Sequence, residues 1–144
     1  MTICPICEKH KKKDASILYE NAHWAVSAGP HASQVLGYYY LEPKRHVENW
    51  TDLSVQELTE MGPLVQEVEK VLREEDKAER LYVVTISEAV RHLHLHLIPR
   101  SREEEVKGLP LIEQATQQKV KTSKQVAVLE YDRLNDRVSS YLNR

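Results

Sequence analysis

The sequence predicts a single domain that combines short β-strands with helices, and three observations carry this prediction. The chain has 144 residues, which suits one domain with a sizeable core. Several short runs are rich in β-branched and aromatic residues and are bounded by turn residues, which indicates strands. The segment 54–74 instead repeats apolar residues every three or four positions, which indicates a helix with one buried face.

Five strands are expected. Ile17–Glu20 and Trp24–Ala28 flank a turn and should form an antiparallel hairpin. The aromatic segment Gly37–Glu42 should be a third strand, which the proline after it should end because proline cannot donate to a sheet ladder. Leu81–Ile86 leads through a short turn into the stretch 92–98, so these last two should also pair as a hairpin.

The long helix should begin near Ser54, which forms a possible capping box with Glu57. Gly62 and Pro63 interrupt the helical pattern. Proline removes a backbone hydrogen bond and clashes with the preceding turn, so we expect a kink that leaves two helical pieces.

The segment 101–144 is expected to be a helical C-terminal extension of the same domain. Gly108 and Pro110 suit the start of a short helix that runs to Gln118. A final helix is expected from about Ser123 to Leu142, with the alternative that its early part, 126–129, forms a strand.

Composition and charge exclude some partners. The net charge is −2 with both signs interspersed, which gives no general attraction to a nucleic-acid polymer or an anionic membrane. No window reaches membrane-spanning length, and the N-terminus lacks a basic region followed by an apolar run. The expected location is therefore the reducing cytoplasm.

Leucine and histidine alternate along the stretch 92–97 with the period of a β-strand. The leucines are Leu93, Leu95 and Leu97, and the histidines are His92, His94 and His96. The leucines should face the core, and the histidine rings should form a row on the other face, roughly 6.6 Å apart. Solvated strand faces normally carry Thr, Lys, Glu or Ser, so the row indicates either metal ligation or nucleophilic and acid-base chemistry on an anionic substrate.

Cys4 and Cys7 have the two-residue spacing of a zinc knuckle. In a reducing compartment, such a pair is more often a metal ligand or a redox centre than a disulfide, and two free surface thiols are the remaining alternative. A zinc site needs two further ligands, for which histidines are available.

The run His92-Leu93-His94-Leu95-His96-Leu97-Ile98, followed by Pro99-Arg100, resembles the signature of the histidine triad (HIT) family of nucleotide hydrolases and transferases. The order of the other features is similar too: a Cys-x-x-Cys pair, a strand that starts at Gly37 and ends in Pro43-Lys44-Arg45-His46, a helix and a strand. The resemblance covers residues 1–100, which would form a histidine-triad domain with an N-terminal zinc knuckle.

The resemblance implies an α+β fold with a meander of antiparallel strands, assembled as a homodimer. It implies that His94 is the nucleophile, which attacks the α-phosphorus of a nucleotide or nucleotide conjugate to give a nucleotidyl-histidine, and that His96 contacts phosphate oxygens. A neutral imidazole is a good nucleophile near pH 7, and the covalent intermediate divides one difficult displacement into two easier ones.

In the zinc-bearing branch of the family, the matching ligands are Cys4, Cys7, His46 and His92. The resemblance thus implies a closed Cys₂His₂ site in which zinc has a structural role.

The chain departs from the family pattern just before the triad. The family usually has Gly-Gln-Ser or Gly-Gln-Thr there, and this chain has Ser87, Glu88 and Ala89. Glu88 is then a candidate acid toward the leaving group. The alternative function is a zinc-stabilised nucleotide-binding or scaffold protein with weak or no turnover.

Overall fold

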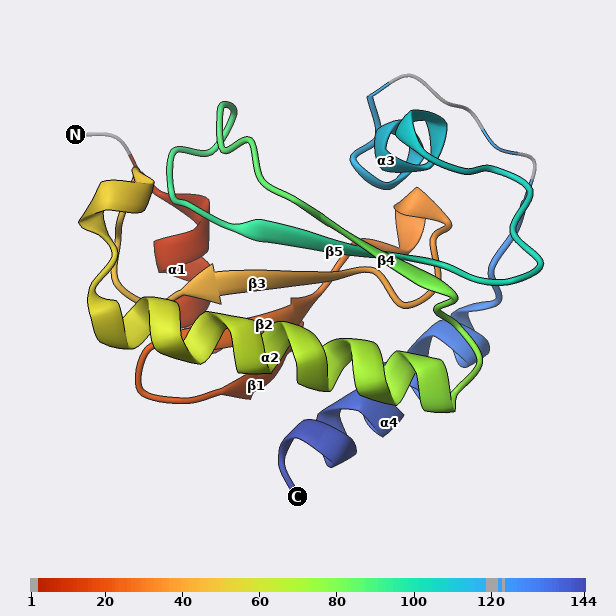
Figure 1. The fold of residues 1–144 in the computed structure, drawn as a ribbon, viewed down its shortest axis with the longest axis horizontal. Coiled ribbons are helices and arrows are strands. Elements are labelled where there is room, and N and C mark those ends of the chain that lie inside the picture. Colours follow the sequence, from red (N-terminus) through yellow and green to blue (C-terminus); the bar gives the residue numbers. More distant parts are fainter. Residues whose placement is uncertain (1–2, 119–121, 123) are drawn as a thin grey trace.

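A five-stranded antiparallel sheet and four α-helices form the protein in a computed structural model, which describes residues 3–118, 122 and 124–144 (Figure 1). The strands are β1 (Ile17–Glu20), β2 (Trp24–Ala28), β3 (Tyr39–Pro43), β4 (Arg80–Val84) and β5 (Leu95–Arg100). The helices are α1 (Pro5–Lys11), α2 (Val55–Glu74), α3 (Leu109–Ala115) and α4 (Val128–Leu142), with 3₁₀ turns at His31–Ser33 and Trp50–Asp52. The expected α+β class and antiparallel sheet are confirmed.

The order of the strands is β1-β2-β3-β5-β4, so β5 lies between β3 and β4. Strands β1 to β3 follow one another as a meander, and α2 then carries the chain past β3 to the outer edge, where β4 begins. In this register, His96 of β5 lies opposite Tyr40 of β3 on one side and Val84 of β4 on the other. The histidine strand is thus central and has a partner on both sides.

The two faces of the sheet are covered differently. Side chains from α2 and α4 pack on one face in the main core, together with Leu93, Leu95 and Leu97. The expectation that these leucines face the core is confirmed. Helix α3 packs on the other face, where Leu111 contacts a smaller cluster with Tyr38 and Ile98. His96 alternates with the core leucines along β5, so it belongs to the face of α3.

Helix α2 is one continuous helix of 20 residues, so the predicted division at Pro63 is wrong. The capping box of Ser54 and Glu57 is present as expected. Proline removes the hydrogen bond to the carbonyl of Thr59, but both residues lie on the exposed side of the helix, where water can hydrate that carbonyl. Leu64 and Val68 continue the buried stripe on the opposite side, and this packing outweighs the local effect of proline.

Several boundaries differ from the sequence-based expectation. Strand β3 starts at Tyr39 and includes Pro43, which was expected to end it, and β4 is Arg80–Val84 instead of Leu81–Ile86. Sheet pairing starts only at Leu95, so His92 and His94 precede β5. The short helix after Gly108 ends at Ala115. Helix α4 starts at Val128, which excludes a strand over 126–129, and the expected start at Ser123 lies outside the described residues.

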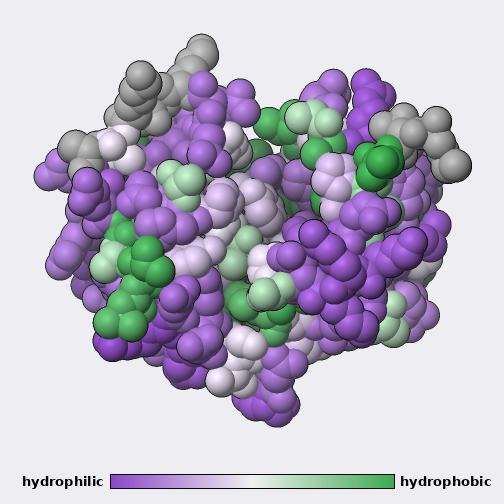
Figure 2. Space-filling model, turned by 180° about the vertical axis from the view of Figure 1, so that it is seen from behind, coloured by the Kyte–Doolittle hydropathy of each residue, from purple (hydrophilic) through white to green (hydrophobic). Residues whose placement is uncertain are grey.

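The surface seen from behind is mostly hydrophilic, with small and separate apolar areas (Figure 2). None of the helices among the described residues has the length and apolar character that a bilayer span requires.

Candidate active site and metal centre

Helix α1 presents the two cysteines to the rest of the protein. Cys4 is the N-cap residue of α1, and its Sγ accepts a hydrogen bond from the backbone N–H of Cys7 at 3.3 Å. The proline at the first helical position has no N–H to leave unpaired, so it fits this start. No helix was predicted over these residues from the sequence. One turn of helix brings both sulfur atoms to the same side.

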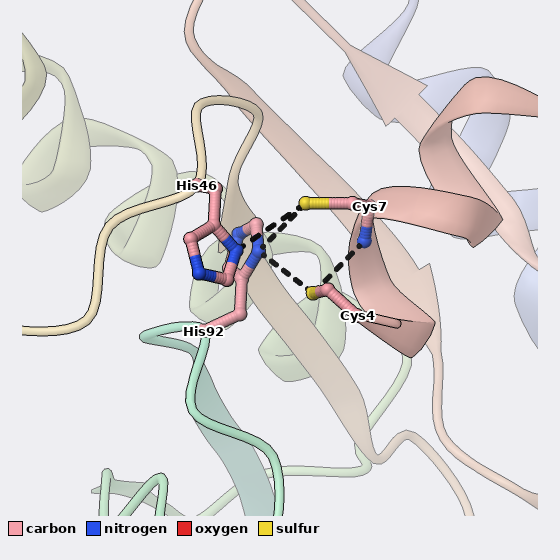
Figure 3. Close-up of side chains that lie close together, drawn as sticks. All are labelled: Cys4, Cys7, His46 and His92. Carbon is pink, nitrogen blue, oxygen red and sulfur yellow. Dashed lines mark hydrogen bonds between the residues drawn. The ribbon is translucent and has the colours of Figure 1, made fainter. Parts of the chain in front are cut away.

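The two cysteines meet two histidines from distant parts of the chain. His46 follows β3 and His92 precedes β5, and the four side chains converge (Figure 3). Their ligand atoms all lie within 4.8 Å of one another. The Nδ1 atom of His92 lies 3.4 Å from both sulfur atoms, and the Nδ1 atom of His46 lies 3.4 Å from Sγ of Cys7.

The second ring nitrogen of each histidine has an acceptor. Nε2 of His92 lies 2.7 Å from the carbonyl oxygen of Pro43, and Nε2 of His46 lies 3.4 Å from a carboxylate oxygen of Glu48. An Nε2–H donated to these oxygens leaves both Nδ1 atoms free to bind a metal. Burial also lowers the pKa of His92, which favours the neutral imidazole that metals require. Two thiolates and two imidazoles in a closed arrangement fit structural zinc.

A redox role for the cysteine pair is not supported. Burial, together with the neighbouring Cys4, raises the pKa of the Cys7 thiol to about 11. A redox cysteine needs the opposite shift, because the thiolate is the reactive form. Cys4 and Cys7 would hold the metal as thiolates, and this site would tie α1 to the segment that carries the triad.

The three histidines do not form one row, contrary to the sequence-based expectation. His92 is fully buried in the metal centre, whereas His94 and His96 are half-buried, with ring centroids 5.0 Å apart. The strand rule fails for His92 because sheet pairing has not yet begun there. Its ring instead packs edge-on against His46, with centroids 5.1 Å apart.

The ring of His94 has a defined hydrogen-bonding partner. Its Nδ1 lies 2.7 Å from the backbone carbonyl oxygen of His92. A carbonyl oxygen can only accept, so Nδ1 carries a proton. In the neutral ring, the lone pair is then on Nε2.

His96 contacts two tyrosines at the neighbouring strand β3: Tyr38 lies just before β3, and Tyr40 lies within it. Its Nδ1 lies 2.6 Å from the hydroxyl of Tyr38, and its ring lies edge-on to Tyr40 with centroids 5.4 Å apart. Burial, and next the neighbouring His94, lowers the pKa of His96 to about 4. Burial raises the pKa of Tyr38 above its ordinary value, so both groups are neutral at pH 7.

Glu88 lies apart from these two rings. Its side chain is exposed on the loop between β4 and β5, and it lines a hollow beside the metal centre with Cys4, His46 and Arg91. Among the hydrogen bonds of the described residues, none joins Glu88 to His94 or His96.

A buried charged cluster adjoins the triad and was missed in the sequence. Glu42 is 1% exposed, and its carboxylate accepts from Lys9, from His10 at 2.9 Å and from the hydroxyl of Ser27 at 3.2 Å. Lys9 also lies over the ring of Tyr40, 5.3 Å from its centroid. The alternation along β3 puts Glu42 and Tyr40 on the face of His96, which could have been inferred from the strand period.

Comparisons with known proteins identify a family and a common fold. The family model named HIT domain matches residues 10–103. No curated protein matches the sequence.

Several solved structures share the fold. A hypothetical histidine triad nucleotide-binding protein from Sulfolobus tokodaii is 21% identical, with a TM-score of 0.69 over 97% of this chain and 92% of that one. A zinc-bound histidine triad family protein from Mycobacterium smegmatis is 19% identical, with a TM-score of 0.67 over 97% and 95%. The diadenosine triphosphate hydrolase of Plasmodium falciparum is 13% identical, with a TM-score of 0.60 over 90% and 78%. At these identities the structures show a common fold. The family model spans well over half of the chain, and on this basis the protein belongs to the HIT-domain family.

Proposed function

We propose that this protein is a nucleotide hydrolase or nucleotidyl transferase that acts at the α-phosphate through a nucleotidyl-histidine on His94. The observation that carries the proposal is the 2.7 Å contact between Nδ1 of His94 and the carbonyl oxygen of His92. It assigns the proton to Nδ1 and the lone pair to Nε2, which is the form of imidazole that attacks phosphorus.

The first step forms a bond between Nε2 of His94 and the α-phosphorus and breaks the bond from phosphorus to the leaving group. The leaving group departs with the bonding electrons and takes up a proton from solvent water, because Glu88 makes no hydrogen bond to either ring among the described residues. In the second step, water or another acceptor hydroxyl attacks the same phosphorus and gives its proton to solvent water, while the P–N bond breaks and the imidazole leaves neutral with the bonding electrons. The product is a nucleoside monophosphate or a transferred nucleotidyl group.

His96 would bind the phosphate as a neutral hydrogen-bond donor. In this proposal the hydroxyl of Tyr38, 2.6 Å from Nδ1 of His96, is the donor of that contact, which would place the ring proton on Nε2, directed away from Tyr38. With a pKa of about 4, His96 keeps this form across the neutral pH range. Such a donor stabilises the charge on the phosphate oxygens as the bond to His94 forms.

Zinc supplies no step of this chemistry. Cys4, Cys7, His46 and His92 would fill its four positions, so no position remains for water or substrate. The metal would anchor the segment that leads into His94.

Three further features are proposed for the whole protein. The outer edge of β4 has no strand partner among the described residues, and it carries Val83, 47% exposed, which lines one shallow hollow with the exposed Trp50 and so supports a homodimer formed along this edge. Residues 101–144 would complete the same domain, because Leu134 and Val138 of α4 lie in the main core. The two cysteines form no disulfide and the net charge is −2, which supports a reducing, cytoplasmic setting and a small-molecule substrate.

The test is turnover of a substrate panel: an adenosine phosphoramidate, a dinucleoside polyphosphate and a nucleotide sugar. We expect the zinc-loaded wild type to cleave at least one of them, and the variant His94→Ala to lose at least about 10³-fold in kcat, because no other nucleophile replaces it. His31→Ala, which removes a histidine bound to the carbonyl of Val126, is the matched control. Equal rates for wild type and His94→Ala would refute the proposal. Nucleotide binding without turnover would instead support the scaffold alternative.

A further inference from the structure

The backbone of His94 is held by side chains where the sheet ladder stops. The last pair between β4 and β5 is Val84 with His96, so His94 has no strand partner on that side. The hydroxyl of Thr85 donates to the carbonyl oxygen of His94 at 2.7 Å. The backbone N–H of His94 donates to the hydroxyl oxygen of Ser87 at 3.3 Å. Two hydroxyls from the loop after β4 therefore satisfy both backbone groups of one residue.

Ser87 makes this contact from a conformation that favours glycine. Its φ is 55°, in the left-handed region, which costs a non-glycine residue on the order of 1 kcal/mol. Glycine at this position would relieve the strain but would lose the hydroxyl. The position of the strain, in direct contact with the proposed nucleophile, indicates that the hydroxyl has a use there.

The same hydroxyl also reaches the ring. Oγ of Ser87 lies 3.5 Å from Nδ1 of His94, and this same nitrogen donates to the carbonyl oxygen of His92. When Nε2 bonds to phosphorus, the ring becomes cationic and its Nδ1–H becomes a stronger donor. Two oxygen atoms near Nδ1 then stabilise the charge that develops during the reaction.

We propose that Thr85 and Ser87 are positioning residues for His94. They hold its backbone beyond the end of the ladder, keep Nδ1–H directed to the carbonyl of His92, and so present the lone pair of Nε2 to the substrate. The effect on turnover rests on the function proposed above, whereas the effect on the ring does not.

The test uses paired variants at each position. Thr85→Val removes the hydroxyl at nearly constant volume, whereas Thr85→Ser keeps it. Ser87→Ala removes the hydroxyl and keeps the strain, and Ser87→Gly removes both. The matched control is Thr116→Val at the C-terminal end of α3. There the hydroxyl of Thr116 donates to the carbonyl oxygen of Ile112 at 2.8 Å, and the variant loses this bond.

Two measurements are made on zinc-loaded proteins. The first is the tautomer of His94, read from the nitrogen shifts of ¹⁵N-histidine-labelled protein, with His94→Ala identifying the signals. We expect a single Nδ1–H form in the wild type, Thr85→Ser and Thr116→Val, and a mixture of tautomers in Thr85→Val, Ser87→Ala and Ser87→Gly. The second is kcat and KM on the substrate that the wild type turns over.

The kinetic expectation follows from the geometry. Loss of either hydroxyl should lower kcat by roughly 10-fold to 100-fold, the range that a small misplacement of a reacting group causes, with KM within about threefold. Thr85→Ser should return to within about threefold of wild type. Ser87→Gly should have as low a kcat as Ser87→Ala, although its melting temperature should equal or exceed that of Ser87→Ala.

The outcomes are distinct. Unchanged kcat together with a single Nδ1–H tautomer in Thr85→Val and Ser87→Ala overturns the proposal, as does a Ser87→Gly variant that is as fast as the wild type. If the wild type turns over none of the substrates, the proposed function fails, and the tautomer measurement alone supports or overturns the positioning role.

Discussion

The buried Glu42 allows a quantitative test of how α1 is attached to the sheet. In the variant Lys9→Met, Glu42 keeps His10 and Ser27 but loses its ammonium partner. Removing one partner of a buried ion pair costs about 3–5 kcal/mol, because the remaining charge is left uncompensated. The side chain of Lys9 is 20% exposed and His10 remains, so we expect the lower end, about 3 kcal/mol.

The assay is urea and thermal unfolding at pH 7 with zinc in excess. For a chain of this size, about 3 kcal/mol corresponds to a fall in Tm of roughly 10 °C. The double variant Lys9→Met with Glu42→Gln should recover more than about 1 kcal/mol relative to Lys9→Met alone, since it no longer buries an unpaired charge. Lys12→Met is the control, because its pair with Asp14 is 4.0 Å long and exposed, and it should change stability by less than about 0.5 kcal/mol.

The pH dependence provides a second arm. Burial by itself raises the pKa of Glu42, but the hydrogen bond from His10 and the charge of Lys9 outweigh it and lower the pKa below its ordinary value. A lowered folded-state pKa gives stability that is present above the unfolded value of about 4.3 and is lost as the pH falls through the folded value. The difference between wild type and Lys9→Met should therefore shrink below about pH 4. If Lys9→Met is as harmless at pH 7 as Lys12→Met, the cluster does not secure α1 and the reasoning fails.

Three further predictions concern the metal, the phosphate contact and the dimer. Cys4→Ser should reduce bound zinc, measured by plasma mass spectrometry, from about one per chain to a small fraction, with a lower Tm, because a tetrahedral site loses one of four ligands; retention of stoichiometric zinc would contradict the ligand set. Tyr38→Phe should lower kcat about tenfold because it releases the tautomer of His96, and a kcat equal to that of the wild type would exclude this role of the tyrosine. The stability of the wild type should also fall on account of His96 as the pH drops from about 6.5 to about 4, because only the unfolded state binds the extra proton in this range. Val83→Lys should shift a dimer toward monomer in analytical ultracentrifugation while Leu109→Lys, also at an exposed apolar position, should not, since only the former lies on the open edge of β4; an unchanged sedimentation coefficient would place the interface elsewhere.

Periodicity and local capping were sufficient to predict much of the fold. The leucines at 93, 95 and 97 lie in the core as the period of two requires, and the Ser54–Glu57 box starts α2. Both features depend on residues close together in sequence. The continuous path of α2 through Pro63 did not follow from local rules, because burial of Leu64 and Val68 against the sheet decides it.

The candidate site was predicted less completely, and the reason is physical. The resemblance to the HIT family correctly grouped Cys4 and Cys7 with His46 and His92, which the residue pattern alone left open. The partner of His96 comes from a pairing between distant segments. Tyr38 reaches His96 because β3 lies beside β5, and no local pattern specifies that register.

Helix α1 was missed for a related reason. The segment after Cys7 is rich in charge and buries few apolar residues, so it has no clear helical periodicity. Its start is defined by the Cys4 cap, and its position depends on the metal centre and on the bonds from Lys9 and His10 to Glu42. These are tertiary interactions that become visible only once the sheet is assembled.

The most direct test of the account is to quench the protein during turnover and determine its intact mass, followed by peptide mapping. The account predicts a mass increment equal to one nucleotidyl group, located on His94 and absent from His94→Ala. Turnover by the wild type without any such increment, or an increment on a different residue, would contradict it.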